Sequence, residues 1–129
     1  MSDDETSVPA VRNILDLEAE GTEIEVATET QSTGWKINQP STTVEDPSIL
    51  ELHLTNPPVK RIDLHFPLGT NVTARNATGV TIKDALDAIY KAFKRRSDEE
   101  LEKLYLAGFE WDNENWAQLT VHRASEPAN

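Results

Sequence analysis

The three histidines carry the most versatile side-chain chemistry in this sequence, because imidazole serves as a general base and as a metal ligand near neutral pH. His53 and His65 occupy polar positions in two segments that alternate like strands, and His122 takes the polar position of a third. Neighbouring strands would bring all three to one sheet face, where a small hydrolase or a metal-dependent enzyme could use them. Alternation alone does not make ligands converge on a metal, so solvated sheet-face side chains are the favoured interpretation. We expect no metal and no cofactor.

The other groups that catalysis needs are absent or fall in structural positions. Cysteine is missing, which excludes a thiolate zinc site and a disulfide framework. No serine lies in a Gly-x-Ser-x-Gly elbow, and no glycine-rich loop is suited to hold a phosphate. The many carboxylates lie at polar, cap or loop positions and not in apolar surroundings that would raise the pKa of an acid. The sequence therefore predicts no catalytic residue and favours a protein without enzymatic activity.

The tryptophans are the candidates for an interaction site. Trp111 and Trp116 flank a polar loop, and Trp35 lies far earlier in the chain. Exposed tryptophan favours protein interfaces or stacking on sugars, so a carbohydrate-binding module is one alternative function. Packing in the core is the competing interpretation for at least two of the three.

Charge argues against two classes of partner. The chain holds 23 acidic and 12 basic residues, a net charge of −11. Residues 1–29 contain nine acidic residues against Arg12 alone, so most of the excess lies there. Such a field repels phosphate backbones and anionic lipid, and we expect binding to neither nucleic acid nor membranes. One basic cluster comprises Lys91, Lys94, Arg95 and Arg96. Acidic residues follow it at once, so we favour charge balance within the chain over phosphate binding or a nuclear signal.

Hydrophobic periodicity predicts the elements that would position these side chains. Alternating or apolar runs predict strands over 23–28, 35–37, 49–54, 61–66, 72–74, 109–111 and 116–122. Thr81 with Asp84 forms a variant of the capping box and begins a helix, whose apolar stripe comprises Ile82, Leu86, Ile89, Tyr90 and Phe93. A second helix is expected from Ser97, with Glu100 as its capping partner, to Gly108. This order predicts an α+β fold, a largely antiparallel sheet with two consecutive helices packed on one face.

The domain organisation follows from composition. Residues 1–20 are expected to be an acidic, mostly disordered tail, residues 21–123 a single α+β domain, and residues 124–129 a disordered C-terminal tail. The acidic N-terminus lacks the basic start and apolar run of a signal peptide. No apolar stretch approaches the roughly 20 residues of a membrane span. A cytoplasmic or nuclear protein is the consistent expectation.

Several motifs between Trp35 and His122 resemble one family. They are Trp35 with Pro40, Pro57-Pro58, the segment Arg61–Phe66 and, above all, the stretch Val80–Tyr90. Together they resemble a fungal family of domains of unknown function, numbered 6699. The resemblance implies the same α+β fold, and it implies no activity, because that family has none established.

These observations favour a non-catalytic protein-interaction module with a protein partner that the sequence does not identify. A small hydrolase or metal-dependent enzyme, and a carbohydrate-binding module, stay open as alternatives. The oligomeric state does not follow from the sequence.

Overall fold

The computed structural model describes residues 11–67, 69–97, 99–101, 103–112, 114 and 116–124. Its helices are α1 (Ile14–Glu20) and α2 (Ile82–Phe93), with 3-10 turns η2 (Thr28–Ser32), η3 (Ser41–Thr43) and η4 (Pro47–Glu51). Its strands are β1 (Glu25–Val26), β2 (Thr55–Asn56), β3 (Arg61–His65), β4 (Asn71–Arg75), β5 (Tyr105–Trp111) and β6 (Gln118–Ala124). The predicted α+β class is confirmed.

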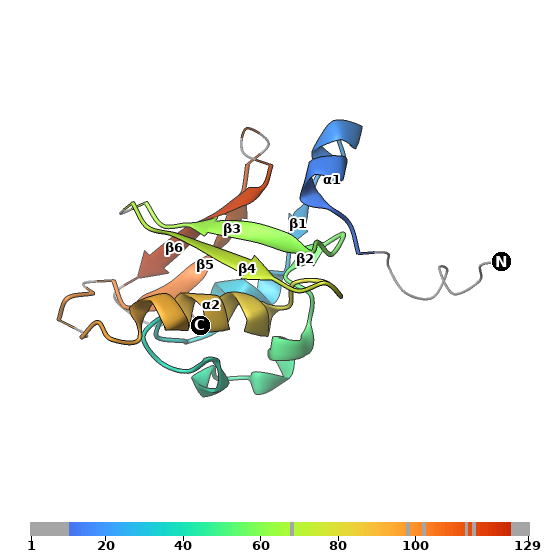
Figure 1. The fold of residues 1–129 in the computed structure, drawn as a ribbon. Coiled ribbons are helices and arrows are strands. Elements are labelled where there is room, and N and C mark those ends of the chain that lie inside the picture. Colours follow the sequence, from blue (N-terminus) through green and yellow to red (C-terminus); the bar gives the residue numbers. More distant parts are fainter. Residues whose placement is uncertain are drawn as a thin grey trace.

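A four-stranded sheet in the order β4-β3-β6-β5 forms the centre of the fold (Figure 1). The pairs β3–β4 and β5–β6 are antiparallel, whereas β3 and β6 run parallel. Alternation along β3 is confirmed, because Ile62 and Leu64 are fully buried while Arg61 is exposed. β1 and β2 form a separate two-stranded antiparallel sheet.

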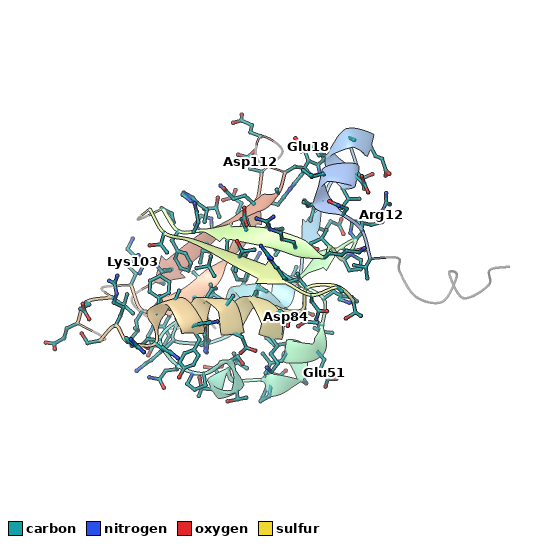
Figure 2. The ribbon with its side chains drawn as sticks, in the orientation of Figure 1. Arg12, Glu18, Glu51, Asp84, Lys103 and Asp112 are labelled. Atoms are coloured by element: carbon teal, nitrogen blue, oxygen red, sulfur yellow. The ribbon has the colours of Figure 1, made fainter. Side chains whose placement is uncertain are left out.

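Helix α2 begins where the capping box predicts. The Asp84 amide donates to Thr81 Oγ1 at 3.2 Å, and the Thr81 amide donates to Asp84 Oδ2 at 2.9 Å. Figure 2 shows Asp84 at the start of this helix. The buried stripe of α2 includes Leu86 and Phe93, and the Phe93 ring lies 4.9 Å from that of Phe66. The helix therefore covers the apolar face of the β3–β4 pair (Figure 1).

The expected second helix at Ser97 does not form in the described residues of 97–108. The Ser97 amide donates to Glu100 Oε1 at 2.9 Å and the Glu100 amide to Ser97 Oγ at 3.3 Å, so the capping box closes a single turn. From Tyr105 the chain is β5 instead, and Gly108, with φ of 137°, lies beside a bulge in that strand. A short helix is only marginally stable, and the pairing of β5 with β6 stabilises this part of the chain as a strand instead. One helix, and not two consecutive ones, therefore covers the sheet face.

The expected strand over 49–54 is also wrong. Asp46 Oδ1 accepts from the Ser48 amide at 3.1 Å and Pro47 follows the cap, which starts the turn η4. Such a cap with proline at the first position favours a helical turn over an extended strand. Leu50 and Leu54 are still buried, but Leu52 is 41% exposed.

Helix α1 lies within the segment that was expected to be a tail. Asn13 caps its start and Gly21, with φ of 73°, ends it in the left-handed conformation. Ile14 and Leu17 are buried in the core, so the packed chain begins before residue 21. The remaining parts of the two expected tails, residues 1–10 and 125–129, lie outside the described residues.

Candidate functional site

A groove with a volume of about 290 Å³ runs between the start of α1 and the start of β3. We call it the α1–β3 groove. Its lining includes Ile14, Ile62 and Ala117, which belong to three distant parts of the sequence. Ile14 and Ile62 are 7% and 0% exposed, so their side chains belong to the core and add little open surface. Lys60, Arg61 and Asp63 supply charged groups along the β3 side. The Asp63 amide donates to the Ala117 carbonyl at 3.0 Å, which fixes the β3 side against the turn before β6.

Leu15 borders the same groove and is its most unusual side chain. It is 63% exposed, whereas its neighbours Ile14 and Leu17 are 7% and 0% exposed. Its backbone amide donates to Asn13 Oδ1 at 3.0 Å, which holds the first turn of α1 in place. The core is therefore packed without Leu15, and this side chain stays at the surface beside an apolar hollow.

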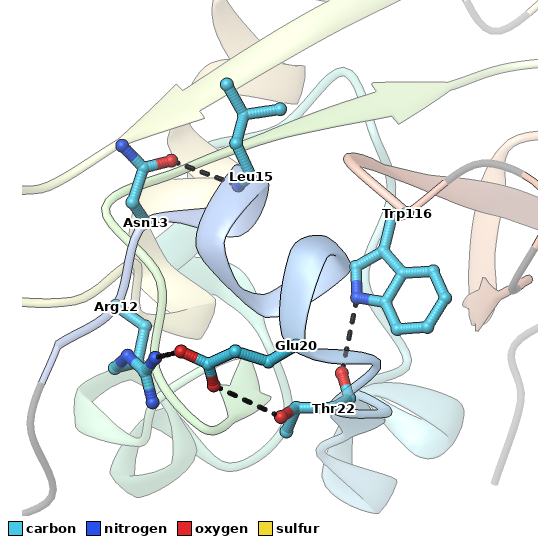
Figure 3. A network of polar contacts seen from close by, with 6 residues as sticks. All are labelled: Arg12, Asn13, Leu15, Glu20, Thr22 and Trp116. Atoms are coloured by element: carbon cyan, nitrogen blue, oxygen red, sulfur yellow. Dashed lines mark hydrogen bonds and ion pairs between the residues drawn. The ribbon is translucent and has the colours of Figure 1, made fainter.

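Contacts at both ends of α1 fix its position (Figure 3). Arg12 forms an ion pair with Glu20, and its backbone amide donates to the Pro58 carbonyl at 2.8 Å. The Trp116 indole nitrogen donates to the Thr22 carbonyl at 3.2 Å, just after the helix. These contacts hold α1 in place at one side of the groove.

Two arginines face each other next to the groove. Arg61 on β3 and Arg75 on β4 are directly opposite in the antiparallel register, and both are exposed. Arg61 lies 3.8 Å from Asp63, and Asp63 Oδ1 also accepts from the Thr73 hydroxyl at 2.8 Å. The groove thus has the exposed apolar side chain of Leu15 on its α1 side and cations on its β3 side.

The structure places His65 and His122 on adjacent strands, with His65 in register with Thr120, two residues before His122, but it does not bring His53 to them. His65 Nδ1 lies 2.6 Å from Asn71 Oδ1, and His122 Nε2 lies 2.8 Å from Glu110 Oε1. His53 lies elsewhere, because its segment is not a strand of the sheet, and its ring is packed against Gly79. Within the described part of the chain, no three His, Asp or Glu side chains are grouped so as to hold a metal ion.

The three tryptophans take structural positions. Trp35 is fully buried, and its indole nitrogen donates to the carbonyls of Gln39 and Pro40. The partly buried rings of Trp111 and Trp116 pack edge to face with centroids 4.8 Å apart, and Trp111 Nε1 donates to the Trp116 carbonyl. Each indole nitrogen is therefore bonded within the fold, and Trp116 contributes to the groove by holding the segment after α1.

The basic cluster Lys91, Lys94, Arg95 and Arg96 is exposed at the end of α2. None of the four forms an ion pair with another described residue. The charge balance predicted for this cluster stays a prediction, since two of the acidic residues that follow, Asp98 and Glu102, lie outside the described residues.

Two pKa shifts have local structural causes. Hydrogen bonds from the Ser48 side chain and backbone hold the pKa of Asp46 below its ordinary value. The hydrogen bond and charge of Asp87, four residues along α2, raise the pKa of Lys83. Both are surface contacts of a cap or a helix, remote from the α1–β3 groove.

Sequence reasoning missed the groove, although part of its signal is present. Asn13 before an apolar pair and Gly21 after it are the start and stop signals of a short helix. A helix over 14–20 that buries Ile14 and Leu17 leaves Leu15 on another side. The contact of α1 with β3, in contrast, has no local signal.

One protein family matches the chain. The model of a family of unknown function (DUF6699) matches residues 15–127, which include most of α1 and every strand described above. No curated protein and no solved structure matches this chain. No helix formed by the described residues is both long enough and apolar enough to cross a membrane.

Proposed function

The chain belongs to the family of unknown function (DUF6699), and from its surface we propose that it is a non-catalytic protein-interaction module. The contact surface in this proposal is the α1–β3 groove. Its occupant is an apolar side chain on an exposed peptide segment of a partner protein. The exposure of Leu15 carries the proposal.

A large apolar side chain that the fold leaves exposed contributes free energy to binding when a partner buries it. Complete burial of a leucine side chain is worth about 1.5–3 kcal/mol. Leu15 exposes 63% of its surface beside a hollow lined by Ile14 and Ile62. A partner side chain seated there would bury its own apolar surface together with that of Leu15, as the central contacts of protein interfaces do.

The size of the groove supports a peptide side chain as its occupant. Sites for small molecules and cofactors usually have volumes of about 300–1,000 Å³ and enclose most of the ligand. The α1–β3 groove, at about 290 Å³, is at the lower limit of that range. It suits one or two side chains of a partner better than a whole cofactor.

The alternative functions have weaker support among the described residues. The hydrolase or metal-enzyme alternative needs the histidines to converge, and they lie on separate contacts. The carbohydrate alternative needs open indole faces, whereas Trp35 is buried and the other two rings pack on each other.

A selection from a random displayed peptide library tests the proposal, with the full chain immobilised. Peptides that are enriched on the wild type should bind Leu15→Ser at least about tenfold more weakly, because their apolar side chain loses its main contact. Leu52→Ser is the matched control. Among the residues that the structure describes, Leu52 is the other large exposed apolar side chain, 41% exposed and outside the α1–β3 groove.

Fluorescence anisotropy with the synthetic peptides gives the affinities, and circular dichroism shows that both variants are folded. Enriched peptides that bind the Leu15→Ser variant as tightly as the wild type would contradict the proposal. So would peptides whose binding depends on Leu52 instead.

A further inference from the structure

We infer that the partner segment carries a carboxylate close to its apolar side chain, and that Arg61 and Arg75 hold this carboxylate. The inference rests on the proposed function and adds the chemical class of the partner: an acidic and apolar peptide segment. The observation behind it is the facing pair of arginines at the edge of the α1–β3 groove.

The position of this pair is unfavourable for the isolated protein. Arg61 and Arg75 are directly opposite on the antiparallel strands β3 and β4. Like charges in such positions destabilise a sheet, because the side chains of opposite residues start only about 5 Å apart. An anion placed between the two guanidinium groups would convert this repulsion into two attractions.

The fold neutralises this charge only in part. Asp63 is the one carboxylate paired with Arg61 among the described residues, at 3.8 Å between two solvent-exposed groups. That distance is long for a charge-assisted hydrogen bond. Arg75 has no ion pair with any described residue. Lys60, exposed beside Arg61, adds a third cation.

These three cations and Asp63 leave a local charge of about +2, in a chain whose net charge is −11. Apart from Asp63, no described carboxylate of the protein forms an ion pair with these cations. An acidic group from outside meets a favourable local field there.

The geometry also sets where the carboxylate must lie in the partner. Arg61 lines the α1–β3 groove and at the same time faces Arg75. A peptide whose apolar side chain enters the groove must therefore present its acid within one or two residues of that side chain, since an extended residue spans about 3.3 Å. Arginine suits this role, because its planar fork matches a carboxylate.

Three synthetic peptides test the inference, each titrated into the full-length, isotope-labelled protein and followed by NMR amide shifts. The first has a leucine flanked by aspartates, the second has asparagines in place of the aspartates, and the third has an alanine in place of the leucine. We expect the first to shift the signals of Leu15, Arg61 and Arg75. The second should bind about fivefold more weakly.

Two variants complete the test. Arg75→Gln should clearly reduce the difference between the aspartate and asparagine peptides, because Arg61 and Lys60 alone remain to attract the carboxylate. Arg95→Gln is the matched control and should preserve it, because Arg95 is also exposed but lies at the end of α2. Equal affinity of the aspartate and asparagine peptides at the groove would overturn this inference and leave the proposed function standing.

The proposed function fails in a different way. Charge-dependent shifts at Arg61 and Arg75 that persist with the alanine peptide would support the carboxylate contact but contradict the apolar groove. Shifts of the aspartate peptide that map to Lys91–Arg96, or no shift with any of the three peptides, would contradict both.

Discussion

Two leucines, one on α1 and one on α2, have opposite relations to the fold. Leu86 on α2 is fully buried, and Leu15 on α1 is 63% exposed. We expect Leu86→Ala to cost about 2–5 kcal/mol of unfolding free energy, because it leaves a cavity between the helix and the sheet. Such a loss is a large share of the stability of a domain this size.

Lys91→Ala, on the exposed side of the same helix, is the control and should change the thermal midpoint little. Circular dichroism melts of the two variants give the answer. If the Leu86→Ala protein melts with the wild type, α2 is not the element that holds this face of the sheet together.

The arginine pair permits an unusual prediction about stability. Arg75→Gln removes one of two like charges that face each other across β3 and β4, and Arg75 forms no ion pair with a described residue. We expect the unfolding free energy to stay the same or rise by up to about 1 kcal/mol. Urea denaturation at low salt measures it, and high salt should reduce the gain.

A loss of more than about 1 kcal/mol in Arg75→Gln would show that this arginine stabilises the fold, and the case for a bound carboxylate would weaken. Arg12→Gln offers the contrast. It breaks the ion pair with Glu20 that fixes α1, and it should lower stability or leave it unchanged.

At the scale of single residues, the sequence predicts the groups whose role is local. The capping box of Thr81 and Asp84 forms as expected, because its partners are three residues apart. Arg61 falls at the polar, exposed position that alternation predicts, but nothing in that pattern indicates Arg75 as its neighbour. That pairing depends on the register of β3 with β4, which the sequence pattern leaves open.

At the scale of the elements, the packing of helix α1 against the core is likewise not indicated by the local sequence pattern. Two deletions test how much this helix contributes to stability. Removal of residues 1–10 should leave the thermal midpoint nearly unchanged, because this segment offers few large apolar side chains. Removal of residues 1–20 should cost more than about 2 kcal/mol, because Ile14 and Leu17 leave the core.

Differential scanning calorimetry of the two shortened chains distinguishes these cases. A fall of many degrees after the first deletion would place the start of the folded unit before residue 11. An unchanged midpoint after the second would show that α1 contributes nothing to the core.

Two elements differ from the sequence prediction because pairing partners or caps overrule periodicity. Leu101 and Leu104 have helical spacing, but the chain after them pairs with β6 and, through Leu106, with the Trp35 carbonyl. In the segment before β2, the cap at Asp46 and Pro47 favours a turn although Leu50, Leu52 and Leu54 alternate. Periodicity and the capping box predicted β3, α2, β6 and, from a weaker signal over 72–74, part of β4, and there the tertiary contacts agree with the local pattern.

At the scale of the whole molecule, the α1–β3 groove is a product of topology. Asn13, Lys60 and Ala117 meet there because β6 lies parallel to β3 and the segment before α1 pairs beside Val59. These contacts join residues that are dozens of positions apart. No periodic pattern reports them, so the fold class is predictable from the sequence while the candidate site is not.

The net charge leads to a prediction for the complete molecule. At −11, the chain should show no binding or only weak binding to DNA or RNA at physiological salt, because the overall field opposes a phosphate backbone. Gel-shift assays at two salt concentrations measure this. Salt-sensitive binding below micromolar concentration, lost in Arg95→Gln, would make the basic cluster at the end of α2 a functional site.

A hydrogen-exchange footprint of the full chain with a bound, selected peptide would locate the interaction surface. We expect slower exchange in α1 around Leu15 and at the start of β3, with little change near Trp111 and Trp116 or at the end of α2. The Leu15→Ser variant should lose this protection and keep the exchange rates of its core strands. Protection centred on Trp111 and Trp116, on His65 and His122, or on the basic cluster would contradict the claim that the α1–β3 groove is the interaction surface.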